Sequence, residues 1–113
     1  MHELSIVMNI LDTVAENAEK HNAKVVHLIE LDIGKLAGIE FDAFNFATEN
    51  APKTGIFKNV KFSVNKIEPI AQCLDCKKKF ETKEYTTPCP ACNSTKTKII
   101  KGNELKIKSF KID

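Results

Sequence analysis

Four cysteines are the residues whose spacing most clearly predicts chemistry in this sequence. They form two Cys-x-x-Cys pairs separated by twelve residues: Cys73, Cys76, Cys89 and Cys92. Each pair predicts a tight turn that points two thiolates at one centre, and two such turns supply the tetrahedral sulfur set that Zn²⁺ prefers. Four thiolates leave no open position for a water molecule, so we expect a structural zinc site.

Two other chemistries use the same cysteine pairs. Redox-active pairs form reversible disulfides, and a rubredoxin-like site holds iron with four thiolates. A single redox pair needs no second pair, which favours the metal. Such turns often place Gly after the second cysteine, whereas Lys77 and Asn93 stand there in this chain. Asn tolerates a positive φ better than Lys does.

The amino terminus, Met1-His2-Glu3, offers a second set of ligands. A side chain as large as His at position 2 should prevent removal of Met1, so we expect its α-amine to be free. This amine, the backbone nitrogen and imidazole of His2 and the backbone nitrogen of Glu3 lie within chelating reach. With deprotonated amides they make a square-planar site that suits Ni²⁺ or Cu²⁺. Taken alone, a His at position 2 is more often a solvated terminal residue.

The remaining histidines and two acids have structural interpretations. His21 is expected at a helix end, where a cation is favourable. His27 is expected to be packed and hydrogen-bonded within a strand. Glu40 and Asp42 are expected in a helix's first turn, where negative charge meets the positive end of the helix dipole. None of these residues is assigned to a metal from its type and position.

Hydrophobic periodicity predicts an α+β fold, with a small mixed sheet of three strands, two helices and an inserted zinc-ribbon module. The expected elements are helix 3–20, strand 24–33, helix 39–50, strand 59–68, the cysteine-bearing stretch 70–100 and strand 103–112. Because the ribbon lies between the last two strands, we expect one α/β domain of residues 1–68 and 101–113 and a zinc-ribbon domain of residues 69–100.

Three details of these elements are also predicted. The first half of strand 24–33 is apolar on both faces, which indicates a central strand covered on both sides. The alternation in strand 103–112 changes parity, and a bulge near Ser109 would explain this. The buried face of helix 39–50 is expected to contain Ile39, Ala43, Phe46 and Ala47, with Phe41 and Phe44 widening it.

Composition narrows the class of protein. No apolar run approaches the ~20 residues that span a bilayer, and the N-terminus lacks a signal-peptide pattern. We therefore expect a soluble, cytoplasmic protein. Residues 1–65 hold six lysines against nine acids, a net charge of −3, and residues 66–113 hold eleven lysines against six acids, a net charge of +5. There is no Arg, the preferred fork for phosphate and guanine.

Three classes of function are weighed on these residues. A zinc-ribbon nucleic-acid-binding or transcription-associated module would use the lysine-rich half on phosphates, and the absence of Arg counts against it. An enzyme is not expected, because no nucleophile–base pair, phosphate loop or pair of catalytic carboxylates stands out. A metal-binding and transfer protein uses both the cysteines and the amino terminus.

The two ligand sets together resemble the HypA/HybF family of nickel chaperones. The specific parts are Met1-His2-Glu3-Leu4-Ser5 and the cysteine pattern Cys73-x-x-Cys76 with Cys89-Pro-x-Cys92. Leu31-Asp32-Ile33-Gly34 with Leu36-Ala37 resembles the family's strand-to-helix junction, and Gly102-Asn103-Glu104-Leu105 resembles its return strand. The resemblance covers essentially the whole chain. It implies nickel delivery for maturation of nickel–iron hydrogenase and, in some organisms, of urease.

The resemblance also implies roles for single residues. His2 would bind Ni(II) together with the Met1 amine and the neighbouring backbone nitrogens, and Glu3 would tune or shield that site. Glu40 falls where some members carry an acid near the nickel, and the four cysteines would hold Zn(II). The implied partners are a HypB-type GTPase, the hydrogenase large subunit precursor and, in some organisms, urease maturation factors. The implied state is a monomer or weak homodimer, without nucleic acid or membrane.

Overall fold

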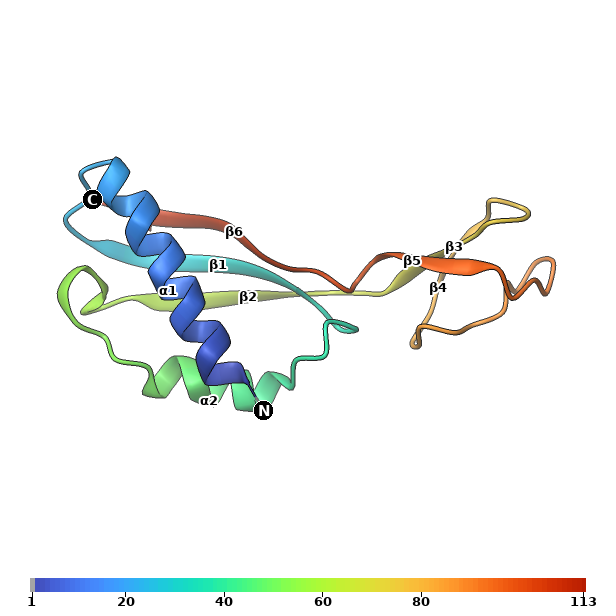
Figure 1. The fold of residues 1–113 in the computed structure, drawn as a ribbon, viewed down its shortest axis with the longest axis horizontal. Helices are drawn as coiled ribbons and strands as arrows, with labels where there is room; N and C mark the ends of the chain where they lie inside the picture. The colour runs from blue at the N-terminus through green and yellow to red at the C-terminus, as the bar shows by residue number, and fades with distance from the viewer. Residues whose placement is uncertain (1) are drawn as a thin grey trace. The chain divides into compact units, whose positions relative to one another are not determined.

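The computed structural model describes residues 2–113, and Figure 1 shows its elements. The chain forms two compact units. One unit extends to Leu31 and includes Ile39–Val64 and Ile107–Asp113, and the other contains Asp32–Gly38 and Asn65–Lys106. The division of the chain into residues 1–68 with 101–113 and residues 69–100 remains a prediction. No helix in residues 2–113 is long and apolar enough to cross a membrane.

The first unit begins with helix α1, Glu3–Lys20, whose bounds match the predicted helix. Its apolar residues recur every three or four positions, so they form one stripe along the helix, and α1 contacts α2. The helix ends at His21, whose backbone N–H donates to the carbonyls of Ala18 and Glu19. The buried residues of this stripe are Val7, Ile10, Leu11, Val14 and Ala18.

The main sheet has three strands in the order β2-β1-β6. Strands β1, Val26–Gly34, and β6, Leu105–Ile112, are antiparallel. This follows from backbone bonds at both ends, because Asp113 N–H donates to Val25 O and Gly34 N–H donates to Glu104 O.

Strand β2, Lys61–Ile67, runs parallel to β1. Asn65 donates to the Asp32 carboxylate, and further along both strands Lys35 N–H donates to Ile67 O. The partners therefore advance in the same direction on both strands. One parallel and one antiparallel pair make the mixed sheet that the sequence predicts.

The central strand β1 is buried more completely on one face than on the other. Ile29, Leu31 and Ile33 on one face have no exposed surface. By the strand alternation Val26, Leu28 and Glu30 lie on the other face, where Val26 is fully buried and Leu28 and Glu30 are half-buried. The prediction that the first half of the strand is covered on both sides therefore holds at Val26, and the cover is incomplete from Leu28 onward.

His27 on β1 also differs from the prediction. Its side chain is 51% exposed and pairs with the carboxylate of Asp113, with 3.0 Å between Nε2 and Oδ2. His27 is the second residue of β1, and its exposed side chain is not packed in the core.

Helix α2, Phe41–Asn50, buries part of the predicted face. Phe44 and Ala47 are buried as predicted, with Thr48 beside them, whereas Phe46 is 67% exposed and was wrongly placed on the buried face. Phe46 lies about 200° around the helix from Phe44, at about 100° per residue, so the two rings cannot share a face. A short 3₁₀ helix, Gly55–Phe57, follows before β2.

The parity change in the last strand is present in the structure. Ile107, Phe110 and Ile112 are half-buried, while Lys108 and Ser109 between them are both exposed. Two consecutive outward residues are what a local irregularity in the alternation produces.

The second unit contains a smaller antiparallel sheet, in the order β4-β3-β5. Its strands are β3 Ile70–Cys73, β4 Lys79–Glu81 and β5 Thr97–Lys101. Ala71 of the middle strand pairs with Phe80 on one side and Ile99 on the other. These three residues form one face of the sheet and pack with Cys73 and Cys89.

Candidate metal centre

The four cysteines converge on one point in the second unit. Their sulfur atoms all lie within 4.8 Å of one another, with 3.5 Å between Cys73 and Cys92 and 3.6 Å between Cys76 and Cys89. A tetrahedral Zn²⁺ with Zn–S bonds of about 2.3 Å separates its sulfurs by about 3.8 Å. The arrangement therefore fits a four-sulfur metal site, and all four predicted zinc ligands lie in it.

The two cysteine turns have the same backbone pattern. In the first, Lys77 N–H donates to Cys73 O and Cys73 N–H donates to Lys78 O. In the second, Asn93 N–H donates to Cys89 O, and Cys89 N–H in turn donates to a carbonyl five residues later. Each turn thus curls around its first cysteine and brings its second sulfur alongside.

The residue after each second cysteine has a left-handed backbone. Lys77 has φ 67° and Asn93 has φ 63°. Glycine is the residue that adopts this conformation without a steric cost. Both turns therefore form with non-glycine residues in the left-handed conformation, and the steric strain of that conformation costs free energy.

Backbone donors favour the thiolate form of the first cysteine in each turn. The N–H of Cys76 lowers the pKa of the Cys73 thiol to about 6, against the opposing effect of burial. In the second turn the N–H of Cys92, followed by that of Ala91, lowers the pKa of Cys89. Hydrogen bonds to a charged group stabilise that form.

The pKa of the last thiol, that of Cys92, is raised by the sulfurs around it. The Ser94 N–H lowers the pKa of Cys92, but the neighbouring sulfur of Cys73, then burial and the other sulfurs, raise it to about 12. Four thiolates within this distance repel one another. A divalent cation supplies the positive charge that makes the fully ionised set stable.

Polar contacts outside the sulfurs join the two turns. The Ser94 hydroxyl donates to the Asp75 carboxylate, which lies between the first two cysteines, and accepts from Lys96 N–H at 3.0 Å. The spacing of the cysteines gives no signal for this link, because its partners are nineteen residues apart.

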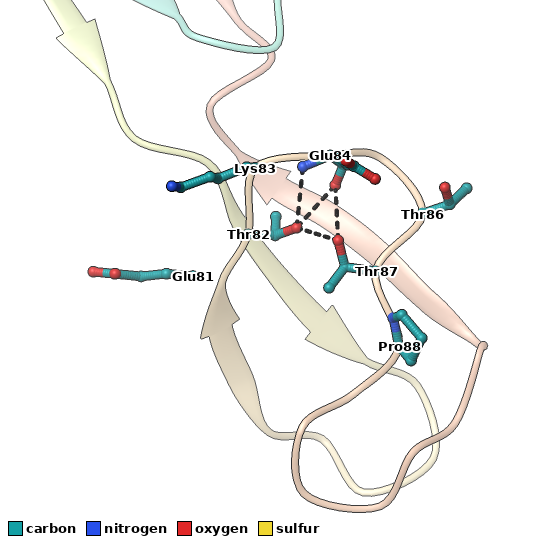
Figure 2. Close-up of a pocket in the computed structure, with 7 residues that line it drawn as sticks. All are labelled: Glu81, Thr82, Lys83, Glu84, Thr86, Thr87 and Pro88. Carbon is teal, nitrogen blue, oxygen red and sulfur yellow. Dashed lines mark hydrogen bonds between the residues drawn. The ribbon is translucent and has the colours of Figure 1, made fainter.

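A threonine-rich loop leads from β4 to the second turn (Figure 2). The Thr82 hydroxyl contacts that of Thr87 and bonds the backbone of Glu84, and Thr97 donates to the Thr87 carbonyl at 3.1 Å. The loop borders a pocket of about 410 Å³ that reaches Pro88, next to Cys89. These bonds fix the path of the chain into the second turn, and sequence reasoning did not identify them.

The N-terminal candidates lie in the first unit. His2 is exposed and forms the N-cap of α1, without a side-chain capping bond. Its carbonyl accepts the first bond of the helix, from Ile6 N–H at 3.0 Å. The backbone nitrogens of His2 and Glu3 precede this donor, so neither contributes an i→i−4 bond to the helix. Met1, the other predicted ligand, lies outside the described residues.

Glu3 connects the starts of the two helices. It is only 6% exposed, and its carboxylate accepts from Glu40 N–H at 3.3 Å. Hydrogen bonds to the charged form lower the pKa of Glu3, and burial opposes them to a smaller extent. Glu3 is therefore an ionised, anchored residue beside His2.

The Glu40 side chain is used by its own helix. Its two carboxylate oxygens accept from Asp42 N–H at 3.1 Å and Ala43 N–H at 2.7 Å, so Glu40 is the N-cap of α2. This agrees with its interpretation as a helix-start acid. The structure brings Glu40 to Glu3, and it does not group His2, Glu3 and Glu40 as a metal site among residues 2–113.

Comparison with known proteins agrees with this arrangement. The family model for "Hydrogenase/urease nickel incorporation, metallochaperone, hypA" matches residues 1–112. The chain belongs to the HypA family. A hydrogenase maturation factor HypA of Chlorobium phaeobacteroides is 37% identical over the full length of both chains. One from Parabacteroides distasonis is 40% identical, with 99% of this chain and 97% of the relative covered.

Solved structures share the fold of this HypA-family chain. The solution structure of the Ni metallochaperone HypA from Helicobacter pylori is 24% identical and superposes with a TM-score of 0.71, covering 99% of this chain and 97% of that one. A second HypA solution structure has a TM-score of 0.67 at 23% identity. Two helices, two small sheets and a four-cysteine cluster are therefore features of a known architecture.

Proposed function

We propose that this chain is a nickel metallochaperone that binds Ni(II) at its amino terminus and delivers it for maturation of nickel–iron hydrogenase. Membership of the HypA family over residues 1–112 carries this proposal. It acts by binding and transfer, not by catalysis. Its partners are a HypB-type GTPase and the hydrogenase large subunit precursor, and urease maturation factors are the partners to test where urease is present.

The proposed nickel site consists of the His2 imidazole, the backbone nitrogens of His2 and Glu3, and the Met1 amine. The exposed position of His2 at the start of α1 supports it, because the imidazole is accessible to a metal ion and makes no capping bond to the helix. Two deprotonated amides cancel the charge of Ni²⁺, which matters beside the positive end of the α1 dipole. A site at a chain end is also accessible for ligand exchange with a partner.

The proposed structural metal is Zn(II), held by Cys73, Cys76, Cys89 and Cys92. The sulfur separations and the lowered pKa of Cys73 support a closed four-thiolate site. Purified protein should contain about one tightly bound zinc per chain. Metal analysis that found no zinc together with two reversible disulfides would support the redox interpretation instead.

The deciding experiment changes the chain end alone. One residue added before Met1 converts the terminal amine into an ordinary amide, although every side chain is retained. Nickel binding should weaken nearly as much as in His2→Ala, while zinc content stays the same because the thiolates are unaffected. A C-terminal extension of equal size is the control and should leave nickel affinity unchanged. Isothermal titrations of these proteins in one buffer measure the difference.

The same titrations separate two ligand sets. Native-start protein should show the yellow, diamagnetic absorption of square-planar Ni(II), lost as the amine and imidazole protonate in acid. If the extended protein binds nickel as tightly as the native-start protein, the amine is not a ligand. Glu3 and Glu40 would then be the first side chains to test, by substitution with Gln.

A further inference from the structure

Strand β2 has an open backbone edge. In the order β2-β1-β6 it is an outer strand, so within residues 2–113 only its side towards β1 is paired in the sheet. Ile67 directs its carbonyl at β1, where Lys35 N–H binds it. In a parallel pair, alternate residues direct their N–H and C=O groups to the same side. Phe62 and Val64 have the opposite parity from Ile67, so their backbone groups point to the outer side.

A groove lies beside this edge, between β2 and α2. Its volume is about 420 Å³. Val60 and Phe62 supply apolar surface from the strand side, and Thr48 contributes from the helix. The Thr48 hydroxyl donates to the Asn45 carbonyl at 2.8 Å, so its own polar group is already satisfied. An open strand edge next to a helix-lined groove is the arrangement used to bind peptides as an added strand.

The charges around the groove indicate what kind of segment fits. Lys53 and Lys61 line it, against the single carboxylate of Glu49. The Lys53 ammonium donates to the Glu49 carbonyl at 3.1 Å, which holds the positive charge near the end of α2. An extended segment with acidic side chains next to one apolar side chain therefore complements this groove.

We propose that the outer edge of β2 and the adjoining groove bind an extended acidic segment of a partner protein as a fourth strand of the sheet. The partner's backbone would pair with Phe62 and Val64, and one apolar side chain would enter the groove. A second copy of this chain is a poor occupant, because its outer strands are basic. Its β6 carries Lys106, Lys108 and Lys111, which would meet Lys53 and Lys61. The proposal does not depend on either metal site.

The test uses a synthetic peptide as the probe. The peptide is acetyl-Glu-Val-Glu-Leu-Glu-Val-amide, and its matched control carries Lys in place of each Glu. Titration into ¹⁵N-labelled, zinc-loaded full chain should shift the amide resonances of Phe62 and Val64 and slow their hydrogen exchange. The control peptide should bind at least about tenfold more weakly, because its charges are reversed. Equal binding of the two peptides, or no shift with either, would overturn the proposal.

Two matched pairs of variants test the groove itself. Asn45→Trp fills the groove and should weaken the acidic peptide at least about tenfold, whereas Asn50→Trp, on the same helix outside the groove, should stay within about twofold. Lys53→Glu should weaken it in the same way, with Lys58→Glu as its control. Unchanged affinity in both groove variants would refute the site. If the Phe62 and Val64 amides shift with protein concentration alone, a second copy occupies the edge and the proposal is wrong.

Discussion

Lys77 and Asn93 show how single residues set the cost of the cysteine turns. Both follow the second cysteine of a pair, and both have φ above 60°. The sequence was sufficient to identify these two positions, because Cys-x-x-Cys turns have a fixed local geometry. It could not show whether Lys77 and Asn93 would adopt a positive φ, since that depends on how closely the two cysteine pairs come together in the fold.

Replacement of Lys77 by Gly should therefore stabilise the second unit. Gly adopts φ near +67° without the clash of a Cβ, so the gain should be about 1 kcal/mol. Asn93→Gly should gain less, because Asn tolerates this region. Lys78→Gly is the control, since Lys78 has no positive φ and should lose stability. Chemical unfolding of the zinc-loaded protein measures all three, and a loss of stability in Lys77→Gly would contradict the strain argument.

Other single-residue contacts were beyond sequence reasoning. The carboxylate of Glu3 meets the backbone of Glu40, 37 residues away. No periodicity or spacing encodes such a contact, because it depends on how α1 and α2 pack. The sequence could only identify Glu40 as a helix-start acid, and its two bonds to Asp42 and Ala43 confirm that local part.

At the scale of elements, the predictions succeeded where one pattern dominated. The five buried apolar residues of α1 form one regular stripe in a helix of eighteen residues, and both ends of the helix were predicted correctly. Helix α2 has only ten residues and carries three Phe within six positions, Phe41, Phe44 and Phe46. Several faces then look apolar, and only packing decides that Phe44 is buried and Phe46 exposed. The strands β3, β4 and β5 were not predicted individually, because each is too short for one periodic pattern to dominate.

Two glycines fix the backbone where β1 ends and the chain returns from the small sheet. A Cβ on Gly34 would lie 2.0 Å from the carbonyl carbon and oxygen of Gly102. A Cβ on Gly102 would lie 2.4 Å from the Pro69 Cα, and Gly102 also has φ +99°. Backbone approaches backbone here, so no side chain can move aside.

Alanine substitutions at glycines should distinguish the steric cost of an added Cβ from the cost of a positive φ. Gly34→Ala and Gly102→Ala should each destabilise the protein by more than about 2 kcal/mol, because the strands must move apart. Gly38→Ala is the matched control. Gly38 has φ +78° but nothing within 4 Å of its added Cβ, so only the backbone cost of about 1 kcal/mol applies. Denaturant unfolding should rank Gly38→Ala as the mildest, and a reversed order would contradict the close-approach argument.

At the scale of the whole molecule, the two units have cores of different kinds. The first unit buries large apolar side chains such as Val7, Ile29 and Phe44. In the second unit the small sheet packs a cluster of Ala71, Cys73, Phe80 and Cys89 with Ile99 beside them, so two members of this cluster are metal ligands. Without the metal, the three apolar residues of the cluster would have to hold the small sheet and its turns together.

Removal of the metal should therefore unfold one unit and spare most of the other. Zinc supplies on the order of 10 kcal/mol in modules of this size. A strong chelator, or Cys73→Ala, should abolish protection of amides in β3, β4 and β5, while those of α1 remain protected. Hydrogen exchange followed by NMR measures both in one sample. Equal loss of protection in α1 would show that the two units fold as one.

The charge distribution of the whole chain leads to a last prediction, on nucleic acid. The seventeen basic residues are all Lys, and those of the second unit are spread over β4, β5 and the turns. Few of these lysines can contact successive phosphates of one nucleic-acid strand, and four metal-bound thiolates reduce the local positive charge further.

Binding to a 20-base-pair DNA duplex or a single-stranded RNA should therefore be weak, with Kd of about 10⁻⁴ M or higher at physiological salt, and it should not depend on base sequence. Fluorescence anisotropy at several salt concentrations measures this. Tight, sequence-dependent binding in 150 mM salt would favour the zinc-ribbon nucleic-acid module over the nickel chaperone. Weak binding that disappears as salt increases is the result expected of scattered lysines.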